Sequence, residues 1–73
     1  MWEVYFESSC CGIYHKVGVV KTRREAIKLM FYRYEDFNER YNINLEGYAL
    51  PRGNEVYETR DEEYKLTYRK VVR

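Results

Sequence analysis

Residues 22–41 read TRREAIKLMFYRYEDFNERY, and this stretch decides the fold. Its first four residues match a capping box, in which the Thr22 hydroxyl takes the amide proton of Glu25 and the Glu25 side chain reaches back to the cap. Apolar and aromatic residues then recur at the i, i+3, i+4, i+7 spacing of an amphipathic helix, with no Gly or Pro inside the stretch. The pattern predicts a helix over 22–42 that ends near Asn42, a residue that tolerates the left-handed conformation.

The predicted helix has an apolar face and one departure from it. The face is expected to carry Ala26, Ile27, Met30, Phe31, Tyr34, Phe37 and Tyr41. Leu29 and Tyr32 fall on the opposite side as an i, i+3 pair. Together with Arg33, they predict an exposed apolar and cationic spot on the back of the helix.

Residues 2–20 are expected to form a hairpin, because apolar and polar side chains alternate with the period of a half-buried strand. In the first strand, Trp2, Val4 and Phe6 face one way and Glu3, Tyr5 and Glu7 the other. In the second run, the residues expected to share one face are Ile13, His15, Val17 and Val19. Gly18 predicts a bulge or the close approach of another backbone.

Residues 46–72 are expected to form a three-stranded meander. Its strands and turns fall at residues 46–50, 51–54, 55–59, 60–62 and 63–72. In the last strand, Tyr64, Leu66, Tyr68 and Val72 alternate with Lys65, Thr67, Arg69 and Arg73. The order β-β-α-β-β-β predicts one α+β domain over 1–73, an antiparallel or mixed sheet with the helix packed across one face.

Length and charge limit the function. A chain of 73 residues excludes a cofactor-binding α/β enzyme, a barrel or a repeat array. Its 13 basic and 12 acidic side chains nearly cancel, but they are segregated. The sums are −1 over 1–20, +4 over 21–34, −6 over 35–63 and +4 over 64–73. Such blocks fit complementary contacts inside the fold, a solvated face or a polarised surface for a charged partner.

Cys10, Cys11 and His15 are the residues that nucleophilic or metal chemistry would use. A catalytic Cys–His pair needs the base within about 3 Å and an oxyanion hole, for which so small a domain has little room, so we expect no enzyme activity. A structural zinc site needs four ligands at established spacings, and here two of three candidates are adjacent. Adjacent cysteines form only a strained disulfide ring. We therefore expect a reduced hairpin loop, with no metal and no cofactor.

The compartment follows from what the sequence lacks. No apolar run approaches the ~18 residues of a membrane span, and the first residues do not have the pattern of a secretory signal. With its reduced cysteines, the chain is expected to be a soluble cytoplasmic protein that does not use a membrane. Because it starts at Met without a visible tag, we expect a complete small reading frame.

Nine tyrosines point to protein recognition, since Tyr is enriched at interface hot spots with Trp and Arg. Four of them, Tyr34, Tyr41, Tyr64 and Tyr68, belong to apolar stripes and are expected in the core, whereas Tyr5, Tyr14, Tyr32 and Tyr57 do not. The sequence thus predicts a non-catalytic protein-binding module whose partner is a host protein, a ribonucleoprotein complex or a second copy in a homodimer. The residues expected at the interface are Leu29, Tyr32, Arg33, Glu55, Tyr57, Glu58, Asp61 and Glu62.

A narrower hypothesis follows from size and style. Small, tyrosine-rich, charge-segregated chains without a catalytic set are typical of phage or mobile-element accessory proteins, many of which inhibit host machinery such as CRISPR-type defence. On this hypothesis the protein acts in the host cytoplasm. Its acidic residues would occupy a basic nucleic-acid groove on the target: Glu46, Glu55, Glu58, Asp61, Glu62 and Glu63.

The alternative is nucleic-acid binding. Lys65, Arg69 and Arg73 lie on one face of the last predicted strand, with Thr67 among them and tyrosines beside them in sequence. Sheet faces that combine cations with aromatic rings bind single strands by phosphate neutralisation and base stacking. The sequence has no RNP-type motif and no Gly-rich phosphate cradle, and the acidic block would repel a nucleic-acid backbone.

Overall fold

The structure is a computed structural model that describes residues 1–49 and 55–71. Its elements are β1 (Trp2–Ser8), β2 (Ile13–Val20), α1 (Arg23–Tyr41), β3 (Glu46–Ala49), β4 (Glu55–Glu58) and β5 (Tyr64–Lys70). This confirms the predicted order β-β-α-β-β-β. The turn predicted at 51–54, together with Leu50, Val72 and Arg73, lies outside the described residues.

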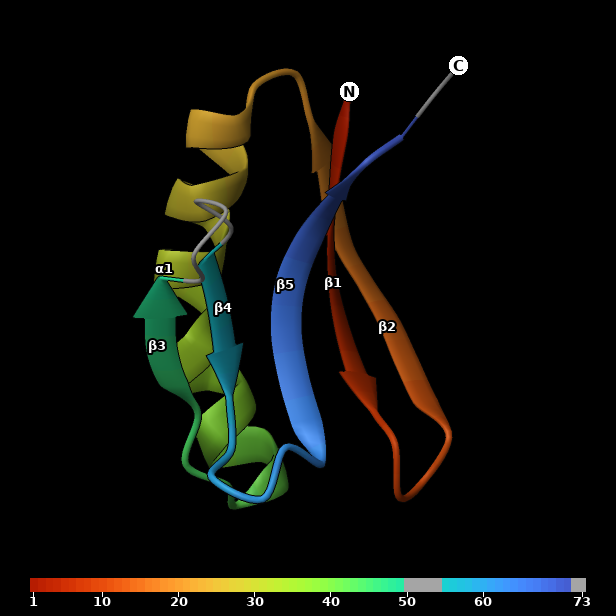
Figure 1. Ribbon diagram of the computed structural model, residues 1–73, viewed down its shortest axis with the longest axis vertical. Coiled ribbons are helices and arrows are strands. Elements are labelled where there is room, and N and C mark those ends of the chain that lie inside the picture. Colours follow the sequence, from red (N-terminus) through yellow and green to blue (C-terminus); the bar gives the residue numbers. More distant parts are fainter. Residues whose placement is uncertain (50–54, 72–73) are drawn as a thin grey trace.

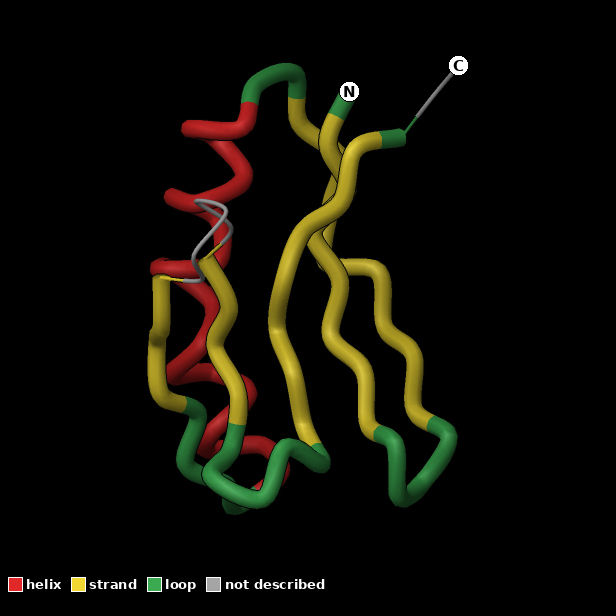
Figure 2. Tube along the Cα trace, viewed as in Figure 1, coloured by secondary structure: helices red, strands yellow, loops and turns green. Residues whose placement is uncertain are grey.

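The strands form one sheet in the order β2-β1-β5-β4-β3, and each neighbouring pair is antiparallel rather than mixed. The first and last strands are thus neighbours in the middle of the sheet, with Trp2 opposite Lys70 and Ser8 opposite Tyr64. Figure 1 shows α1 running along one face, behind β3 and β4. Figure 2 shows the same arrangement as a helix layer and a strand layer, so the sheet has one covered face and one open face.

The ends of α1 form largely as the capping pattern predicts. The Thr22 hydroxyl accepts a hydrogen bond from the Glu25 amide at 3.2 Å, and Glu25 accepts one from the Lys21 amide, one residue before the cap, at 3.1 Å. The helix stops at Asn42, whose φ of 52° is left-handed and whose amide donates to the Asn38 carbonyl. No helix among the described residues is both long and apolar enough to cross a membrane.

A bulge interrupts β2. Val4 pairs with Gly18, but the next residue of β1, Tyr5, pairs with Lys16, so Val17 is an extra residue on the β2 side. A bulge of this kind leaves one residue unpaired and breaks the two-residue alternation of its strand. The bulge that the glycine predicts is therefore found, one residue before Gly18.

The bulge overturns one predicted side-chain direction. The alternation places Val19 on the same face as His15, but Val19 pairs with Glu3 and so lies on the open face. Gly18 faces α1 instead. A Cβ added to Gly18 would lie 3.1 Å from Cδ2 of Leu29, so the close approach at this glycine is made by a side chain and not by another backbone.

The core lies between α1 and the covered face of the sheet. Its buried members are Val4, Phe6, Ala26, Met30, Phe37, Leu45, Leu66 and Tyr68. The ring of Phe6 stacks on Phe37 with centroids 4.4 Å apart, and Tyr41 and Tyr64 flank it at 5.1 and 6.0 Å. Of the four tyrosines predicted for the core, Tyr68 is buried and the other three are partly buried against it, so this prediction is confirmed.

Candidate protein-binding surface

Two aromatic rings on α1 lie in solvent. The side chain of Phe31 is 60% exposed and that of Tyr32 is 72% exposed. Their rings meet edge to face with centroids 6.0 Å apart. Phe31 also approaches Tyr34, at 6.1 Å between centroids, so the pair borders the covered core.

The sequence assigns Leu29 to this exposed surface and Phe31 to the core, and both assignments are wrong. Leu29 is partly buried and packs against the core beside Gly18. The buried face is centred between Ala26 and Met30, and at 100° per residue Leu29 lies nearer to that centre than Phe31 does. The glycine in β2 leaves room for the leucine, and this is a tertiary contact that helical periodicity does not contain.

Charged residues continue the line of the two rings along α1. We call this line the outer stripe; it consists of Arg24, Lys28, Phe31, Tyr32, Glu35 and Glu39, all of them exposed. Residues three and four apart share a side of a helix, which places the bases, the rings and the acids in sequence along one line. Glu35 accepts a hydrogen bond from the Tyr34 hydroxyl at 3.1 Å. The outer stripe is thus basic at one end, aromatic at its centre and acidic at the other end.

Two other residues predicted for this surface lie elsewhere. Arg33 pairs with Asp36 at 3.5 Å between Nη1 and Oδ2, and both line a hollow with His15 of β2. Tyr57 of β4 lies on the covered face, where its ring stacks on Tyr34 at 4.6 Å, so the prediction of a free surface ring is wrong. Strand pairing decides this, because Tyr57 sits opposite a buried residue of β5.

Two of the predicted acidic contacts are bound within the fold. Glu55 accepts a hydrogen bond from the Tyr68 hydroxyl at 2.9 Å and pairs with Arg23 at 3.3 Å. Glu58 lies 4.0 Å from the Lys65 ammonium. These pairs join the acidic block of the sequence to its basic blocks. The charge segregation therefore serves, in part, contacts inside the molecule.

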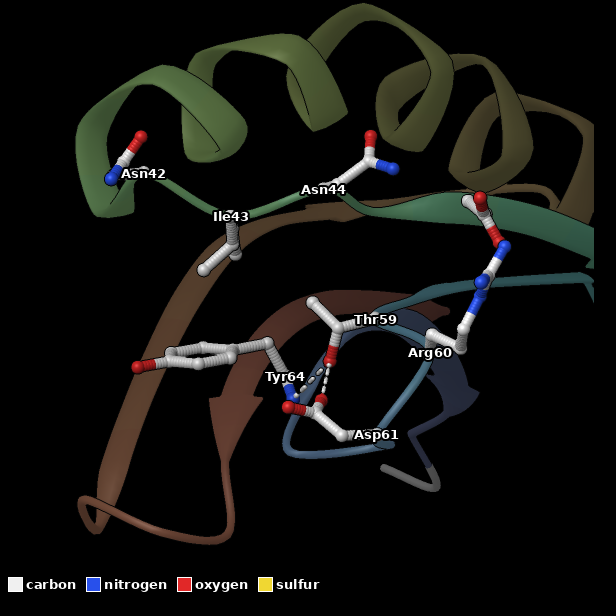
Figure 3. A pocket seen from close by; sticks show the side chains of 8 residues that line it. Asn42, Ile43, Asn44, Thr59, Arg60, Asp61 and Tyr64 are labelled. Carbon is white, nitrogen blue, oxygen red and sulfur yellow. Dashed lines mark hydrogen bonds between the residues drawn. The ribbon is translucent and has the colours of Figure 1, made fainter.

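The other two, Asp61 and Glu62, lie in the turn between β4 and β5. Asp61 accepts hydrogen bonds from the Thr59 hydroxyl and, at 3.2 Å, from the Glu63 amide. The bond from Thr59 is the main reason that the pKa of Asp61 lies below its usual range. Figure 3 shows Thr59 between Asp61 and Tyr64, bonded to both. Glu62 is exposed as well, and its backbone φ of 61° is left-handed.

A cavity of about 490 Å³ opens between the end of α1 and this turn. Its lining residues are Asn42, Ile43, Asn44, Glu46, Thr59, Arg60, Asp61 and Tyr64. Figure 3 shows the side-chain amides of Asn42 and Asn44 pointing away from Thr59 and Asp61. The polar groups do not converge on a common point, and the cavity therefore does not have the arrangement of a small-molecule site.

Two of the basic residues predicted for a nucleic-acid face, Lys65 and Arg69, lie in β5 where the alternation predicts, but both are paired. Lys65 and Arg69 are on the open face, and Arg73 lies outside the described residues. Lys65 faces Glu58, and Arg69 lies 2.9 Å from the Glu3 carboxylate. Phosphate neutralisation needs cations that are not already neutralised, so these pairs reduce what the face offers a nucleic acid.

Arg69 belongs to a compact group on the open face, which we call the open-face cluster: Glu3, Tyr5, Tyr14 and Arg69. The Tyr14 hydroxyl donates to Glu3 and accepts from Arg69 at 3.0 Å. The guanidinium lies 5.1 Å from the centre of the Tyr5 ring, which stacks on Tyr14. The hydrogen bond from Tyr14, with help from Arg69, holds the pKa of Glu3 below its usual range.

Cys10 and Cys11 lie exposed in the turn between β1 and β2, with their sulfur atoms 3.0 Å apart. The hydrogen bond from Cys10, and then that from Tyr64, lowers the pKa of Cys11, and the two thiols raise the pKa of Tyr64 to about 12. His15 is held elsewhere, its ring 5.9 Å from Phe37. Within residues 1–49 and 55–71, no group of three or more His, Cys, Asp or Glu residues is placed to hold a metal ion.

No protein-family model, no curated protein and no solved structure matches this chain. No relative therefore suggests a function, and the surface chemistry is the basis for one.

Sequence reasoning missed Phe31 and the charges on either side of the two rings. The signal was present, because Arg24, Lys28, Phe31, Glu35 and Glu39 follow one another at steps of three or four residues. The signal was overlooked because Phe31 is aromatic, and an aromatic side chain is usually expected in the core. Leu29 and Phe31 stand on opposite flanks of Met30, and only the position of the sheet shows which flank is covered.

Proposed function

We propose that this chain is a non-catalytic protein-binding module and that the outer stripe of α1 is its contact surface. The observation that carries the proposal is the exposure of Phe31 and Tyr32, by 60% and 72%, on a helix whose other large apolar side chains pack against the core. Two adjacent rings flanked by charges have the composition of an interface centre and its rim. Burying each ring would contribute about 1.5–3 kcal/mol to binding, before the cost of association.

A double substitution, Phe31→Ser with Tyr32→Ser, tests the proposal. The folded state should survive, because both side chains stand mostly in solvent, and circular dichroism checks this. A pull-down from nuclease-treated lysate of the natural host cells, followed by mass spectrometry, is the binding measurement. We expect a stoichiometric protein partner with the natural sequence and its loss with the double variant.

The matched control is Tyr48→Ser, which removes another exposed ring from β3, away from the outer stripe. Equal capture by the natural chain and the double variant would contradict the proposal. A partner that is captured from untreated lysate but not from nuclease-treated lysate would contradict it as well.

A narrower form of the proposal is that the module belongs to a phage or mobile element and inhibits a host complex, for instance CRISPR-type defence, in the host cytoplasm. It is supported by the small size, the tyrosine content and the exposed acidic turn. Because Glu55 and Glu58 are paired internally, the residues that would enter a basic groove are Glu62 and Glu63, both exposed. Their reversal to Lys should abolish inhibition in a plasmid-interference assay, and inhibition that survives it contradicts the acidic-groove version.

Nucleic-acid binding is the second candidate, and the open-face cluster is the observation that favours it, because it brings stacked rings and a guanidinium together. The ion pair of Arg69 with Glu3 opposes it. A mobility assay with single-stranded oligonucleotides at low salt decides the matter. Binding through this face should strengthen in Glu3→Gln, which frees the guanidinium, and the absence of any shift removes the candidate.

A further inference from the structure

The charges of the outer stripe oppose the preference of their own helix. A helix favours acidic side chains in its first turn and basic ones in its last. Off the stripe, Glu25 in the first turn and Arg40 in the last follow this rule, whereas Arg23, which pairs with Glu55 across the fold, does not. On the stripe the order is reversed, with Arg24 near the start and Glu39 near the end. The order of charges on the outer stripe therefore does not stabilise α1 itself.

Like charges also stand next to each other within the stripe. Arg24 and Lys28 are four residues apart, as are Glu35 and Glu39, and like charges at this spacing destabilise a helix. In the described part of the chain, the ion pairs involve none of these four side chains. Among the described residues no ion pair therefore offsets either repulsion within one copy of the protein, although Glu35 accepts a hydrogen bond from the Tyr34 hydroxyl.

We infer that the outer stripe binds a second copy of this chain, with the two α1 helices antiparallel. The inference rests on the proposed function and names the partner of the same surface. A two-fold axis between Phe31 and Tyr32 sets these residues of the two copies opposite one another: Arg24 and Glu39, Lys28 and Glu35, Phe31 and Tyr32. A two-fold interface must be complementary to itself, and here every pairing is between opposite charges or between rings.

All three pairings share one midpoint, and this favours a second copy of the chain as the partner. A partner of different sequence would require some complementary charge pattern, but it would not require the two halves of the stripe to mirror each other. The antiparallel arrangement also places the bases of each helix beside the negative end of the other. The rings at the centre would be shielded by ion pairs on both sides, which is the usual order of an interface centre and rim.

The expected dimer is weak and reversible. One exposed line of a five-turn helix offers less area than a standard interface of about 1,600 Å² in total. Sedimentation velocity over a concentration series should show a monomer–dimer equilibrium that shifts toward monomer as salt is raised, because the ion pairs are exposed. Phe31→Ser with Tyr32→Ser should leave only monomer. A natural chain that stays monomeric at every concentration overturns the inference.

A charge exchange tests the antiparallel register. Lys28→Glu and Glu35→Lys should each weaken the homodimer roughly tenfold or more, because each change enters a two-fold interface twice. Carrying both changes in one chain should restore it. Mixing the two single variants should yield a heterodimer in preference to either homodimer, since acid then faces base at both contacts. A double variant as weak as the single variants overturns the inference.

Arg33→Ser is the control, since this arginine is exposed on α1 but lies off the stripe, paired with Asp36. It should leave the dimer unchanged. The two proposals can fail separately. A monomer whose partner capture is lost on replacing Phe31 and Tyr32 contradicts the dimer and retains the binding module. A dimer that is unchanged by those replacements contradicts the inferred dimer interface, and both proposals fail if partner capture is unchanged as well.

Discussion

The two faces of the sheet exclude water by different means. On the covered face Phe6 is fully buried, and its ring stacks on Phe37 from α1 at 4.4 Å. On the open face, where the described residues place no helix, the most buried side chain of the open-face cluster is a carboxylate: Glu3 is 7% exposed. It is enclosed by the hydroxyl of Tyr14 and the guanidinium of Arg69.

The helix α1 covers only one face of the five-stranded sheet (Figure 2). Apolar burial stabilises the covered face, and it depends little on pH or salt. The open face lacks that cover. Val56 is buried there at 6% exposed, but the open-face cluster joins β1, β2 and β5 by charge-assisted hydrogen bonds, which depend on protonation. We therefore expect changes on the two faces to differ both in size and in their response to pH.

Phe6→Ala should break the covered face with the largest effect. Truncating a buried Phe costs about 3–5 kcal/mol of unfolding free energy, against a total of about 5–15 kcal/mol for a typical domain. Urea unfolding followed by circular dichroism measures it. Because the Ala variant is expected to be close to unfolding, Phe6→Leu gives a graded, smaller loss. A cost of less than about 1 kcal/mol for Phe6→Ala would show that the ring stack is not central.

Thr22→Ala should loosen the layer that covers this face. It removes the hydroxyl that accepts the Glu25 amide at 3.2 Å. Losing such a cap costs about 1 kcal/mol, and Thr22→Ser, which keeps the hydroxyl, should cost less. Thermal unfolding of the three proteins provides the comparison. Equal stability of the Ala and Ser variants would mean that the cap contributes nothing.

Glu3→Gln should sharpen the contrast through pH. The pKa of Glu3 is lowered from its ordinary value of 4.5, so the unfolded chain takes up this proton before the folded chain does. The stabilisation is complete above the ordinary value and is lost as pH falls through it to the lowered pKa. Unfolding curves from neutral to acid pH should show the variant less stable at neutral pH and converging with the natural chain in acid. A variant that is less stable than the natural chain by the same free energy of unfolding at every pH contradicts this. Phe6→Leu should show such a constant difference.

Lys65→Ala should have the smallest effect. Its ammonium lies 4.0 Å from Glu58 and is partly in solvent, so the pair is worth about 0.5 kcal/mol or less. Raising the salt concentration should erase the difference from the natural chain. A larger loss that salt does not change would mean that the aliphatic part of Lys65 adds to the apolar burial that Val56 already provides on the open face.

The sequence predicted what local patterns determine. Neighbouring residues determine the cap at Thr22, the end of the helix at Asn42 and the alternation of β1. The structure has all three. The burial of Leu29 was not predictable in this way, because it depends on how α1 is rolled over β2. The side-chain direction of Val19 was predicted wrongly, because a bulge breaks the two-residue period on which the prediction rested.

The candidate site was harder to predict because its decisive contacts are long-range. Glu3 and Arg69 meet only because the first and last strands pair, and neither residue signals the other in the sequence. Glu55 likewise meets Arg23 across the fold. The interface residues were therefore chosen by composition, and the structure kept Tyr32 in solvent while it placed the Tyr57 ring against the core.

The bulge at Val17 also gives the chain a place where its length can change. Gly18 and Lys16, on either side of it, already pair with consecutive residues of β1, Val4 and Tyr5. In a regular strand, deleting one residue turns every later side chain to the opposite face. Deleting Val17 would leave the rest of β2 facing as before, at the loss of its own packing against the core. The hairpin can therefore be shortened by one residue while the other side chains of β2 keep their places on the two faces of the sheet.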